Sequence, residues 1–323
     1  MTIYPDRKKL VPSPLRTMLG LLMSLTVVAM GASCSNSDDS SKSSDDASYY
    51  PHVMEMKNGS TTIPEAPEKV LAIGAVTASS LQDLGVMPIA TADNPDTLPV
   101  QMPWLSEEII NTTDDTLRTK GEYNFEKILE LEPDLIVAPV TAISNMEDFE
   151  RLNAIAPTIS ANSDQKLTNW QDQFLAVAES VNKESQARDM ISEIEDRYSS
   201  AGKNLGMNGK TYTFASYTES GFKYGNGTVL EMLGLSPAEH QDNNGQSLIS
   251  DENISELGAD FMFIWPYPDD LLAKLGDIPG FLSLSENPSH SVYYMDYPKT
   301  VAINDTEPTA LNWLLDNLQT TGF

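Results

Sequence analysis

Two α/β lobes joined by a single long helix are the fold that the sequence predicts. Short apolar runs bounded by Gly or Pro alternate with segments whose apolar residues recur at helical spacing, an order typical of three-layer-like α/β lobes with parallel sheets. Residues 168–201 contain neither Gly nor Pro and keep a helical period throughout. The order of strands and helices before this segment is loosely repeated after it, so we expect one lobe on each side.

The composition limits what such lobes can do. The chain has 323 residues, of which 40% are hydrophobic, enough apolar material for one large or two ordinary domains. Its 47 acidic and 20 basic residues give a formal net charge of −27, which excludes a continuous basic surface for nucleic acid. A single Cys and three scattered His exclude a disulfide framework and structural zinc sites. We therefore expect neither a nucleic-acid partner nor a metal-binding site.

Residues 1–33 are typical of a secretory signal. Basic residues precede an apolar stretch of 16 residues, Thr17 to Ala32, whereas a membrane-spanning helix needs about 20. The stretch leads into Gly31-Ala32-Ser33-Cys34, which resembles the cleavage box of bacterial lipoproteins, in which the Cys receives lipid. We expect cleavage before Cys34 and lipidation of its thiol. A permanent membrane anchor and an ordinary signal with an incidental Cys are the alternatives.

Residues 34–50 are nearly all Ser and Asp, and we expect them to form a disordered tether between the lipid and the first lobe. Removal of residues 1–33, which hold four basic residues and one acidic residue, leaves 16 basic and 46 acidic residues and a charge of −30. Such a charge disfavours adhesion to anionic lipid, so membrane association should come through lipid on Cys34. We expect a lipid-anchored, monomeric bacterial protein at the extracytoplasmic face of the cell membrane.

The first lobe is expected at residues 51–167. Short apolar runs predict its strands, and apolar residues at helical spacing, such as Ala78, Leu81 and Leu84, predict the helices between them. The predicted strands are Lys69–Gly74, Pro88–Ala92, Asp134–Ala138 and Thr158–Ser160. The predicted helices are Thr77–Leu84, which Gly85 should end, Asn124–Leu131 and Glu147–Ile155.

The connecting segment, residues 168–201, carries two apolar stripes with Asn182 available as a cap between them. A continuous helix from Glu184 to Ala201 would run about 27 Å at 1.5 Å per residue, which is long enough to join two lobes. The second lobe is then expected at residues 202–323. Its predicted strands are Lys210–Tyr217, Asp260–Trp265 and Val292–Met295, and its predicted helices are Val229–Leu233, Asp251–Leu257 after Ser250, and Pro308–Leu318.

Four segments together resemble one family. They are PEKVLAIGAVTASSLQDLGVMPIATAD (67–93), NFEKILELEPDLIVAP (124–139), ISDENISELGADFMFI (249–264) and PTALNWLLDNL (308–318). In this order they look like the iron-siderophore substrate-binding lipoproteins of bacterial ABC importers. The resemblance implies a periplasmic-binding-protein-like fold of the class with a helical backbone, with ligand in a shallow cleft between the lobes and little hinge motion. It also implies a protein without enzymatic activity or cofactor that binds a ferric siderophore and delivers it to an ABC permease and its ATPase.

The loops at strand ends supply the candidate ligand contacts, because open α/β sheets bind ligands there. In the family that the chain resembles, a cation just before the helix at Asn124–Leu131 holds the oxygens of the ferric chelate. Lys120 occupies that place, and Arg118 lies two residues earlier. The aromatic and cationic candidates in the second half are Tyr217, Lys223, Trp265, Tyr267, Tyr297 and Lys299. Ordinary surface cations and core aromatics are the alternative interpretation.

Contact with the permease is implied by the resemblance as well, because members of the family present a Glu from each lobe to its Arg residues. Glu231 is the candidate in the second lobe. In the first lobe the corresponding residue is Ser79, and Asp83 follows one turn later. We expect Glu231 and Asp83 to contact the permease; a solvated carboxylate is the simpler interpretation of each.

The acidity of the chain bears on the kind of ligand. It penalises a trianionic catecholate chelate more than a neutral or cationic one, so we expect a hydroxamate-type ferric siderophore. Haem, for which His240, His290 and Tyr217 are the candidate iron ligands, is the alternative, and cobalamin is another. The sequence contains no G-x-S-x-G, no H-E-x-x-H and no phosphate-binding Gly-rich loop, which leaves an exported hydrolase as a remote alternative.

Overall fold

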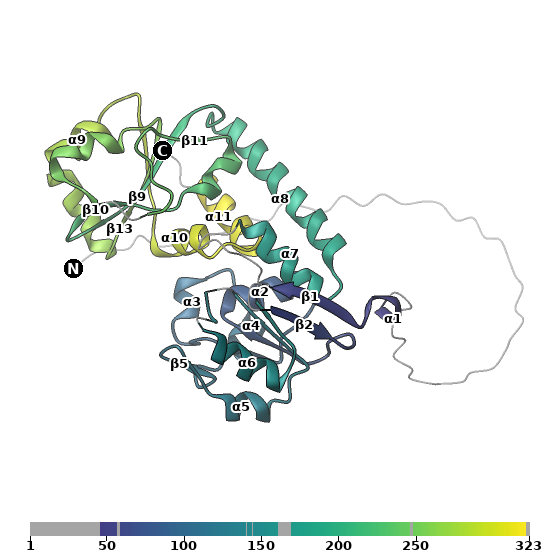
Figure 1. Ribbon diagram of the computed structural model, residues 1–323. Coiled ribbons are helices and arrows are strands. Elements are labelled where there is room, and N and C mark those ends of the chain that lie inside the picture. The colour runs from purple at the N-terminus through teal and green to yellow at the C-terminus, as the bar shows by residue number, and fades with distance from the viewer. Residues whose placement is uncertain are drawn as a thin grey trace, which may run out of the picture. The chain divides into compact units, whose positions relative to one another are not determined.

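Two sheets, one in each half of the chain, form the framework of the protein in a computed structural model (Figure 1). The structure describes residues 46–56, 59–139, 141–143, 145–160, 169–245 and 248–320. All of these residues belong to one compact unit. Strands and helices alternate along them, which confirms the predicted α/β class. The predicted signal and Cys34 lie outside the described residues.

The first sheet has four parallel strands in the order β4-β3-β7-β8. They are β3 Val70–Ile73, β4 Ala90–Ala92, β7 Leu135–Ala138 and β8 Thr158–Ser160. Every residue in these four strands is buried, because helices cover both faces of a parallel sheet. All four strands were predicted, since burial on both faces leaves a short, mostly apolar run in the sequence.

Short helices follow the strands of this sheet. They are α2 Ala75–Asp83, α3 Leu98–Gln101, α4 Glu107–Thr112, α5 Phe125–Glu130 and α6 Met146–Ile155. Side-chain caps begin several of them, as where Asn124 Oδ1 accepts from the Lys127 N–H at the start of α5. Gly74, with φ of +86°, turns β3 directly into α2. The first turn of α2 therefore stands at the carboxyl edge of the sheet.

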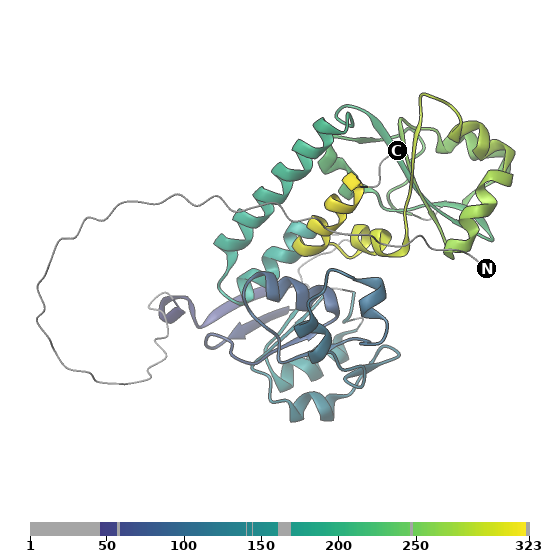
Figure 2. The ribbon, with the colours of Figure 1, turned by 180° about the vertical axis from the view of Figure 1, so that it is seen from behind.

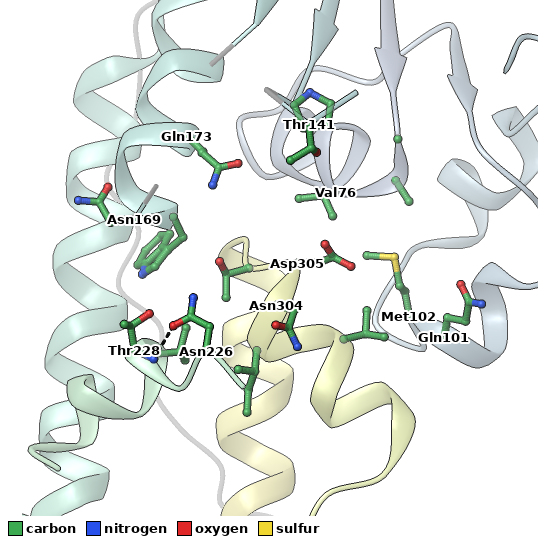
Figure 3. A pocket seen from close by; sticks show the side chains of 18 of the residues that line it. Val76, Gln101, Met102, Thr141, Asn169, Gln173, Asn226, Thr228, Asn304 and Asp305 are labelled. Carbon is green, nitrogen blue, oxygen red and sulfur yellow. Dashed lines mark hydrogen bonds between the residues drawn. The ribbon is translucent and has the colours of Figure 1, made fainter. Parts of the chain in front are cut away.

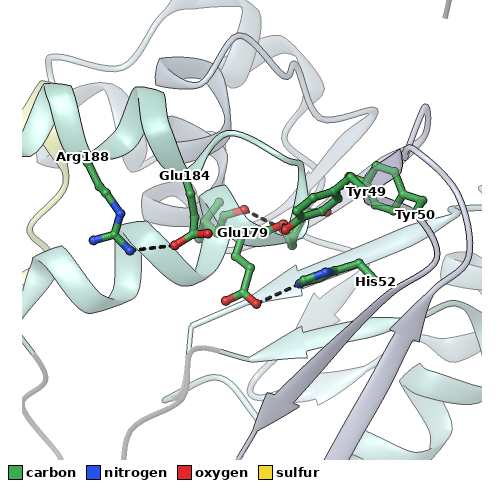
Figure 4. Close-up of polar contacts among 8 residues, drawn as sticks. Tyr49, Tyr50, His52, Glu179, Glu184 and Arg188 are labelled. Carbon is green, nitrogen blue, oxygen red and sulfur yellow. Dashed lines mark hydrogen bonds and ion pairs between the residues drawn. The ribbon is translucent and has the colours of Figure 1, made fainter. Parts of the chain in front are cut away.

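The N-terminal end of the described chain is more ordered than we expected. We expected residues 46–50 to belong to the disordered tether, but residues Asp46–Tyr49 form the helix α1. The hairpin of β1 His52–Met56 and β2 Gly59–Ile63 follows it. The Tyr49 hydroxyl donates to the Glu179 carbonyl oxygen at 2.7 Å, and His52 Nε2 lies 2.9 Å from the Glu179 carboxylate (Figure 4). These contacts fix residues 49–52 against the end of a helix 130 residues later in the chain.

Two helices form the connecting segment, as its two apolar stripes predicted, and the second is the single long helix that joins the lobes. They are α7 Trp170–Ser180, which packs against α2 and β8 of the first lobe, and α8 Glu184–Asn204. With 21 residues, α8 is about 32 Å long and runs from the first lobe to the second (Figures 1 and 2). Asn182 caps the turn between the helices as predicted, but at the end of α7 and not at the start of α8, where Lys183 occupies the capping position. With φ of +56°, its own N–H donates to the Glu179 carbonyl oxygen at 3.2 Å, and the Lys183 N–H donates to the Ala178 carbonyl oxygen at 2.8 Å.

The second sheet is mixed, although we expected parallel strands. Its order is β12-β10-β9-β13-β14, with β11 beside β9. The strands are β9 Thr211–Thr218, β10 Gly221–Tyr224, β11 Ser236–Pro237, β12 Leu248–Ile249, β13 Phe261–Pro266 and β14 Ser291–Tyr294. The strands β9, β13 and β14 are parallel, whereas β10 folds back on β9 as a hairpin and β12 pairs antiparallel with β10. The reversal arises because only two residues separate β9 from β10.

Helical turns cover this second sheet. The 3-10 segments η1 Thr228–Leu233 and η2 Asp251–Leu257 form at the two short helices that we predicted, and η3 Asp269–Asp277 and α9 Pro279–Ser285 follow β13. Gly234, with φ of +78°, ends η1. A buried cluster that includes Phe222, Met262 and Phe281 lies beneath this part of the sheet.

The last two helices return to the first lobe. The helix α10 Tyr297–Asn304 packs against α3, and α11 Pro308–Thr320 packs against α2 and α8. The Tyr198 hydroxyl of α8 donates to the Leu311 carbonyl oxygen at 2.8 Å. One large apolar core therefore runs from β1 through both sheets to Leu318. In the described part of the chain, no helix combines the length and apolar character needed to cross a membrane.

Candidate functional site

A cavity of about 530 Å³ opens where the two lobes meet (Figure 3). It lies at the carboxyl edge of the first sheet, where open α/β sheets hold their ligands. Residues from the first lobe, from the start of α7, from η1 and from α10 line it. Among them are Val76, Gln101, Met102, Thr141, Asn169, Trp170, Gln173, Asn226, Thr228, Tyr297, Asn304 and Asp305.

The walls of this cavity are polar but carry no basic side chain. Six side-chain amides line it: Gln101, Asn169, Gln171, Gln173, Asn226 and Asn304. The carboxyl groups of Asp93 and Asp305 line it too, whereas no Lys, Arg or His is among the described lining residues. The cavity therefore offers hydrogen-bond donors and acceptors together with negative charge.

The two carboxylates of the cavity have different surroundings. The carboxylate of Asp93 caps the N-terminus of α2, since its Oδ2 accepts from the Ala75 N–H at 2.9 Å. Its Oδ1 accepts from the Asn94 N–H at 2.8 Å. Asp305 stands just past the last residue of α10 and is open to the cavity. Its side chain is exposed at the cavity, yet partial desolvation by the protein atoms around it, with the negative charge of Asp93, raises the pKa of Asp305 above its usual range.

Three aromatic side chains that we predicted from the sequence lie together beside the cavity. The ring centroids of Trp265 and Tyr267 are 5.2 Å apart, those of Tyr267 and Tyr297 are 5.9 Å apart, and those of Trp265 and Tyr297 are 6.1 Å apart. We call these three residues the aromatic wall. Of the three, Tyr297 alone belongs to the described cavity lining, and Tyr267, which is 48% exposed, packs beside it.

The other candidates in the second half, Tyr217, Lys223 and Lys299, are not among the described residues that line the cavity. Tyr217, the residue before the last one of β9, packs against Phe222 with ring centroids 4.7 Å apart, and its carbonyl oxygen accepts from the Tyr267 N–H at 2.8 Å. Lys223 stands in β10 rather than in a loop. Lys299 is only 7% exposed, and its ammonium lies 2.6 Å from the Asp296 carboxylate, an ion pair within the first turn of α10.

The two cations of the first lobe line a second, smaller cavity. Arg118 and Lys120 belong to the hairpin of β5 Arg118–Thr119 and β6 Glu122–Tyr123. Lys120 and Gly121 have φ of +52° and +88°, so they form its tight turn. The smaller cavity, about 390 Å³, shares Gly74 and Asp93 with the larger one. The cations therefore stand beside the main cavity and not in its lining.

The side chain of Arg118 is held in place by its neighbours. Its Nη2 donates to the Ala142 carbonyl oxygen at 3.2 Å, and its guanidinium carbon lies 5.2 Å from the centroid of the Tyr123 ring. The Tyr123 hydroxyl donates to the same carbonyl oxygen at 2.8 Å. The guanidinium at the wall of the smaller cavity is thus fixed before any ligand arrives.

The two candidate permease contacts differ in exposure. Glu231 is exposed in η1, where its carboxylate accepts from the Tyr212 hydroxyl at 3.2 Å. Asp83 at the end of α2 is half-buried, and its carboxylate accepts from the Thr309 hydroxyl at 2.6 Å. The carboxylate of Asp83 is therefore directed toward α11.

The candidate haem ligands do not converge on the cavity. None of His240, His290 and Tyr217 is among its described lining residues, and His290 Nδ1 lies 3.1 Å from the Leu284 carbonyl oxygen. The described residues also contain no group of three or more His, Cys, Asp or Glu side chains placed to hold a metal ion.

Sequence reasoning missed most of the cavity lining. It searched strand ends for cations and aromatics, whereas the lining takes amides from the start of α7 and a carboxylate from the end of α10. Asn169 gives a partial signal, because Asn before an apolar helical stripe indicates a cap, and its Oδ1 does accept from the Asp172 N–H at 2.9 Å. No pattern in the sequence brings Asp305 to the same place.

Known proteins resemble the chain in sequence and in structure. Residues 71–267 match the family described as periplasmic binding protein. The Fe(3+)-citrate-binding protein YfmC and the probable siderophore-binding lipoprotein YfiY, both from Bacillus subtilis, are each 28% identical to the chain. The alignment with YfmC covers 76% of this chain and 78% of YfmC, and that with YfiY covers 77% and 79%. A periplasmic solute binding protein from Mycobacterium smegmatis superposes with a TM-score of 0.69 at 24% identity, over 82% of this chain and 95% of its own.

Proposed function

Because the chain belongs to the periplasmic binding protein family, we propose that it is an extracytoplasmic receptor for a ferric siderophore, which it delivers to an ABC permease for iron uptake. The named relatives support this proposal, since one is named for ferric citrate and the other for a siderophore. The ligand would lie in the cavity between the lobes. Its volume of about 530 Å³ falls within the range of small-molecule sites.

The aromatic wall is the observation that carries the proposal. Tyr297 at the start of α10 lines the cavity, and Trp265 of β13 and Tyr267 just after it pack against its ring. Rings of this kind bury flat apolar area and leave their polar atoms available for hydrogen bonds. This combination suits a ferric chelate, whose surface has hydrocarbon faces and a rim of oxygen atoms.

The cations Arg118 and Lys120 would contact the same ligand from the smaller cavity. Because the two cavities share Gly74 and Asp93, a chelate that fills the larger one can extend toward the cations. Arg118 is fixed by Ala142 and Tyr123, so little of its conformational freedom is lost on binding. Lys223 and Tyr217 would lie at the outer edge of such a ligand, and Lys299 would act indirectly by holding the first turn of α10 against Asp296.

A hydroxamate-type chelate fits this site better than a catecholate. The larger cavity has two carboxyl groups and no basic residue among its described lining residues, and the chain without residues 1–33 has a charge of −30. A trianionic chelate would enter against this charge, whereas a neutral or cationic hydroxamate would not. Haem is a weaker candidate because its possible iron ligands lie away from the cavity lining.

Delivery requires contact with a permease and a position at the membrane. Glu231 is the better candidate for an Arg of the permease, because it is exposed while Asp83 is directed toward Thr309. Lipid on Cys34 would hold the protein, as a monomer, at the extracytoplasmic face of the cell membrane, where it could reach the permease and its ATPase.

Tryptophan fluorescence tests the proposed function directly. Trp170 lines the cavity and Trp265 stands in the aromatic wall, so a bound iron chelate should quench both. The purified protein would be titrated with a ferric hydroxamate, a ferric catecholate, haem and cobalamin. Saturable quenching by a ferric siderophore, but not by its iron-free form, is expected. A Soret-band shift with haem and no response to any siderophore would replace the proposal with a haem importer.

A further inference from the structure

Asp305 is an unusual residue to find at its position. It stands at the C-terminal end of α10, where the partial negative charge of the helix dipole disfavours a carboxylate. Within the described part of the chain, no group donates a hydrogen bond to its carboxylate or forms an ion pair with it. The carboxylate therefore adds no cap to the helix and no link to a neighbour, so its place in the fold gives it no structural role.

The electrostatic surroundings of Asp305 make its negative charge costly. Desolvation and the charge of Asp93 both raise its pKa, so the cavity holds an ionised carboxylate only at the expense of free energy. Asp93 is already satisfied by the N–H groups of Ala75 and Asn94. A cation entering the cavity would be attracted to both carboxylates and would relieve the repulsion between them.

A second observation at the same cavity also points to a ligand. Trp170 is 4% exposed, it lines the cavity, and its Nε1 has no hydrogen-bond acceptor among the described residues. A buried indole N–H without an acceptor is rare, because it forfeits the hydrogen bond that water would give. The unpaired N–H calls for an acceptor atom on the ligand, whereas the face of the indole ring is the part that attracts an ammonium group. Figure 3 shows the carboxylate of Asp305 between Val76 and Asn304, with Asn169 and Gln173 of the α7 region across the cavity.

From these contacts we infer that the larger cavity is a subsite for a positively charged group of the ligand, with Asp305 as its principal partner and Asp93 and Trp170 in support. The inference rests on the proposed function and narrows it: the preferred cargo is a ferric hydroxamate that carries a free ammonium group. The amides of Asn169, Gln173 and Asn304 would hydrogen-bond the polar atoms of its chain. The iron-binding oxygens would then be nearer to Arg118 and Lys120 in the adjoining cavity.

Two chelates that differ only in this charge test the inference. Ferrioxamine B is a linear ferric trihydroxamate with one free primary ammonium, and its N-acetyl derivative has the same iron centre without that charge. Titration of the full chain with each, followed by tryptophan quenching, gives the ratio of the two dissociation constants. We expect ferrioxamine B to bind about tenfold more tightly, and the difference to shrink as the salt concentration rises.

Substitution of the carboxylate supplies the second measurement. Asp305→Asn keeps the shape of the side chain and should bring the ratio of the two dissociation constants close to one by weakening ferrioxamine B alone. Asp277→Asn is the matched control, because Asp277 is exposed in η3 and is not among the residues that line the cavity. It removes the same charge from the chain and should leave both constants unchanged. Because Asp305 makes no stabilising contact, the Asn variant should fold, and its melting temperature checks this.

The outcomes separate this inference from the proposed function. Equal affinity of the unsubstituted protein for the two chelates overturns the inference and leaves a ferric hydroxamate receptor. The same holds if Asp305→Asn weakens both chelates equally. Binding of neither chelate, with saturable binding of a trianionic ferric catecholate, also overturns the inference but keeps the siderophore function. Binding of no ferric siderophore at all overturns both.

Discussion

Asp83 and Glu307, which are 224 positions apart in the chain, share one backbone N–H group. The Thr309 N–H donates to the Glu307 carboxylate at 2.7 Å and also approaches the Asp83 carboxylate at 3.3 Å. Glu307 is buried, and the Ala310 N–H donates to its other oxygen at 2.8 Å. The pair thus joins the end of α2 to the start of α11. Burial, and after it the charge of Asp83, raise the pKa of Glu307 well above its ordinary value.

The Glu307 carboxyl should make stability depend on pH. Its raised pKa means that the folded protein binds a proton which the unfolded chain releases near pH 4.3. The free energy of unfolding therefore falls as the pH rises from that value through the folded pKa of Glu307. Glu307→Gln, which stays neutral, should lose this dependence. It should also be less stable than the unsubstituted protein at low pH, by about 1 kcal/mol, because its amide NH2 replaces an oxygen that accepts a backbone N–H. Denaturant unfolding at pH 5 and pH 8 measures both effects, and identical pH profiles would contradict the assignment.

Close packing of α8 on η1 requires a glycine at position 202. A Cβ atom there would lie 1.9 Å from the Leu233 carbonyl oxygen, so the backbones must separate to admit it. Gly202→Ala should lower the free energy of unfolding by about 2 kcal/mol or more. Gly276→Ala is the control, because a Cβ at that position meets no atom within 4 Å. Equal midpoints of denaturation for the two variants would show that α8 and η1 do not pack this closely.

The aromatic wall should contribute to affinity through Tyr267. Tyr267→Ala removes an exposed ring between Trp265 and Tyr297, so we expect binding of a ferric hydroxamate to weaken about tenfold. Tyr294→Ala removes a ring of similar exposure, 45%, that belongs to no ring pair with the wall. Its dissociation constant should match that of the unsubstituted protein. If both variants bind as tightly as the parent, the ligand does not touch the wall.

The charge of Lys120 should strengthen binding without supporting the fold. Lys120→Asn is the suitable variant, because Asn tolerates the φ of +52° that the turn demands. We expect a dissociation constant several-fold higher, and an unchanged melting temperature, since Lys120 lies at the tip of a hairpin. Lys274→Asn, in the exposed part of η3, provides the control for net charge. A loss of affinity in both variants alike would assign the effect to long-range attraction and not to contact.

Cys34 should decide where the protein resides in the cell. If lipid on this residue is the only anchor, Cys34→Ser should release the protein from membranes into the soluble fraction. Cell fractionation followed by immunoblotting measures the distribution. Retention of the variant in the membrane fraction would instead indicate that the apolar stretch from Thr17 to Ala32 remains as an uncleaved anchor.

The family and the parallel half of the fold could be predicted from the sequence. Val70–Ile73 and Leu135–Ala138 are short apolar runs because both faces of their sheet are covered, and this pattern needs no knowledge of distant contacts. The resemblance to iron-siderophore binding proteins rested on such runs in their order and is confirmed by the family match. The hairpin strand Gly221–Tyr224 was missed, because its alternating burial is carried by only two apolar residues, Phe222 and Tyr224.

The site was harder to predict than the fold, since it depends on contacts between remote residues. Asn169 and Asp305 line one cavity although 136 positions separate them in the chain. Lys299 looked like a cation for the ligand, yet its partner, three residues earlier, is Asp296. Trp265, Tyr267 and Tyr297 were chosen as residues at strand ends, and β13 and the start of α10 do bring them together. Local chemistry was therefore predictable, and the assembly of the cavity was not.

The return of α11 to the first lobe bears on how cargo leaves the protein. The backbone passes between the lobes twice, once through α8 and once after β14, and Tyr198 and Asp83 fasten α11 on either side. We expect these two connections to limit motion between the lobes, so that binding spends little free energy on closure of the cleft. If the lobes do not open spontaneously, the ligand has no exit route in the isolated protein. Its release would then require the permease to separate the lobes or to bind the ligand directly.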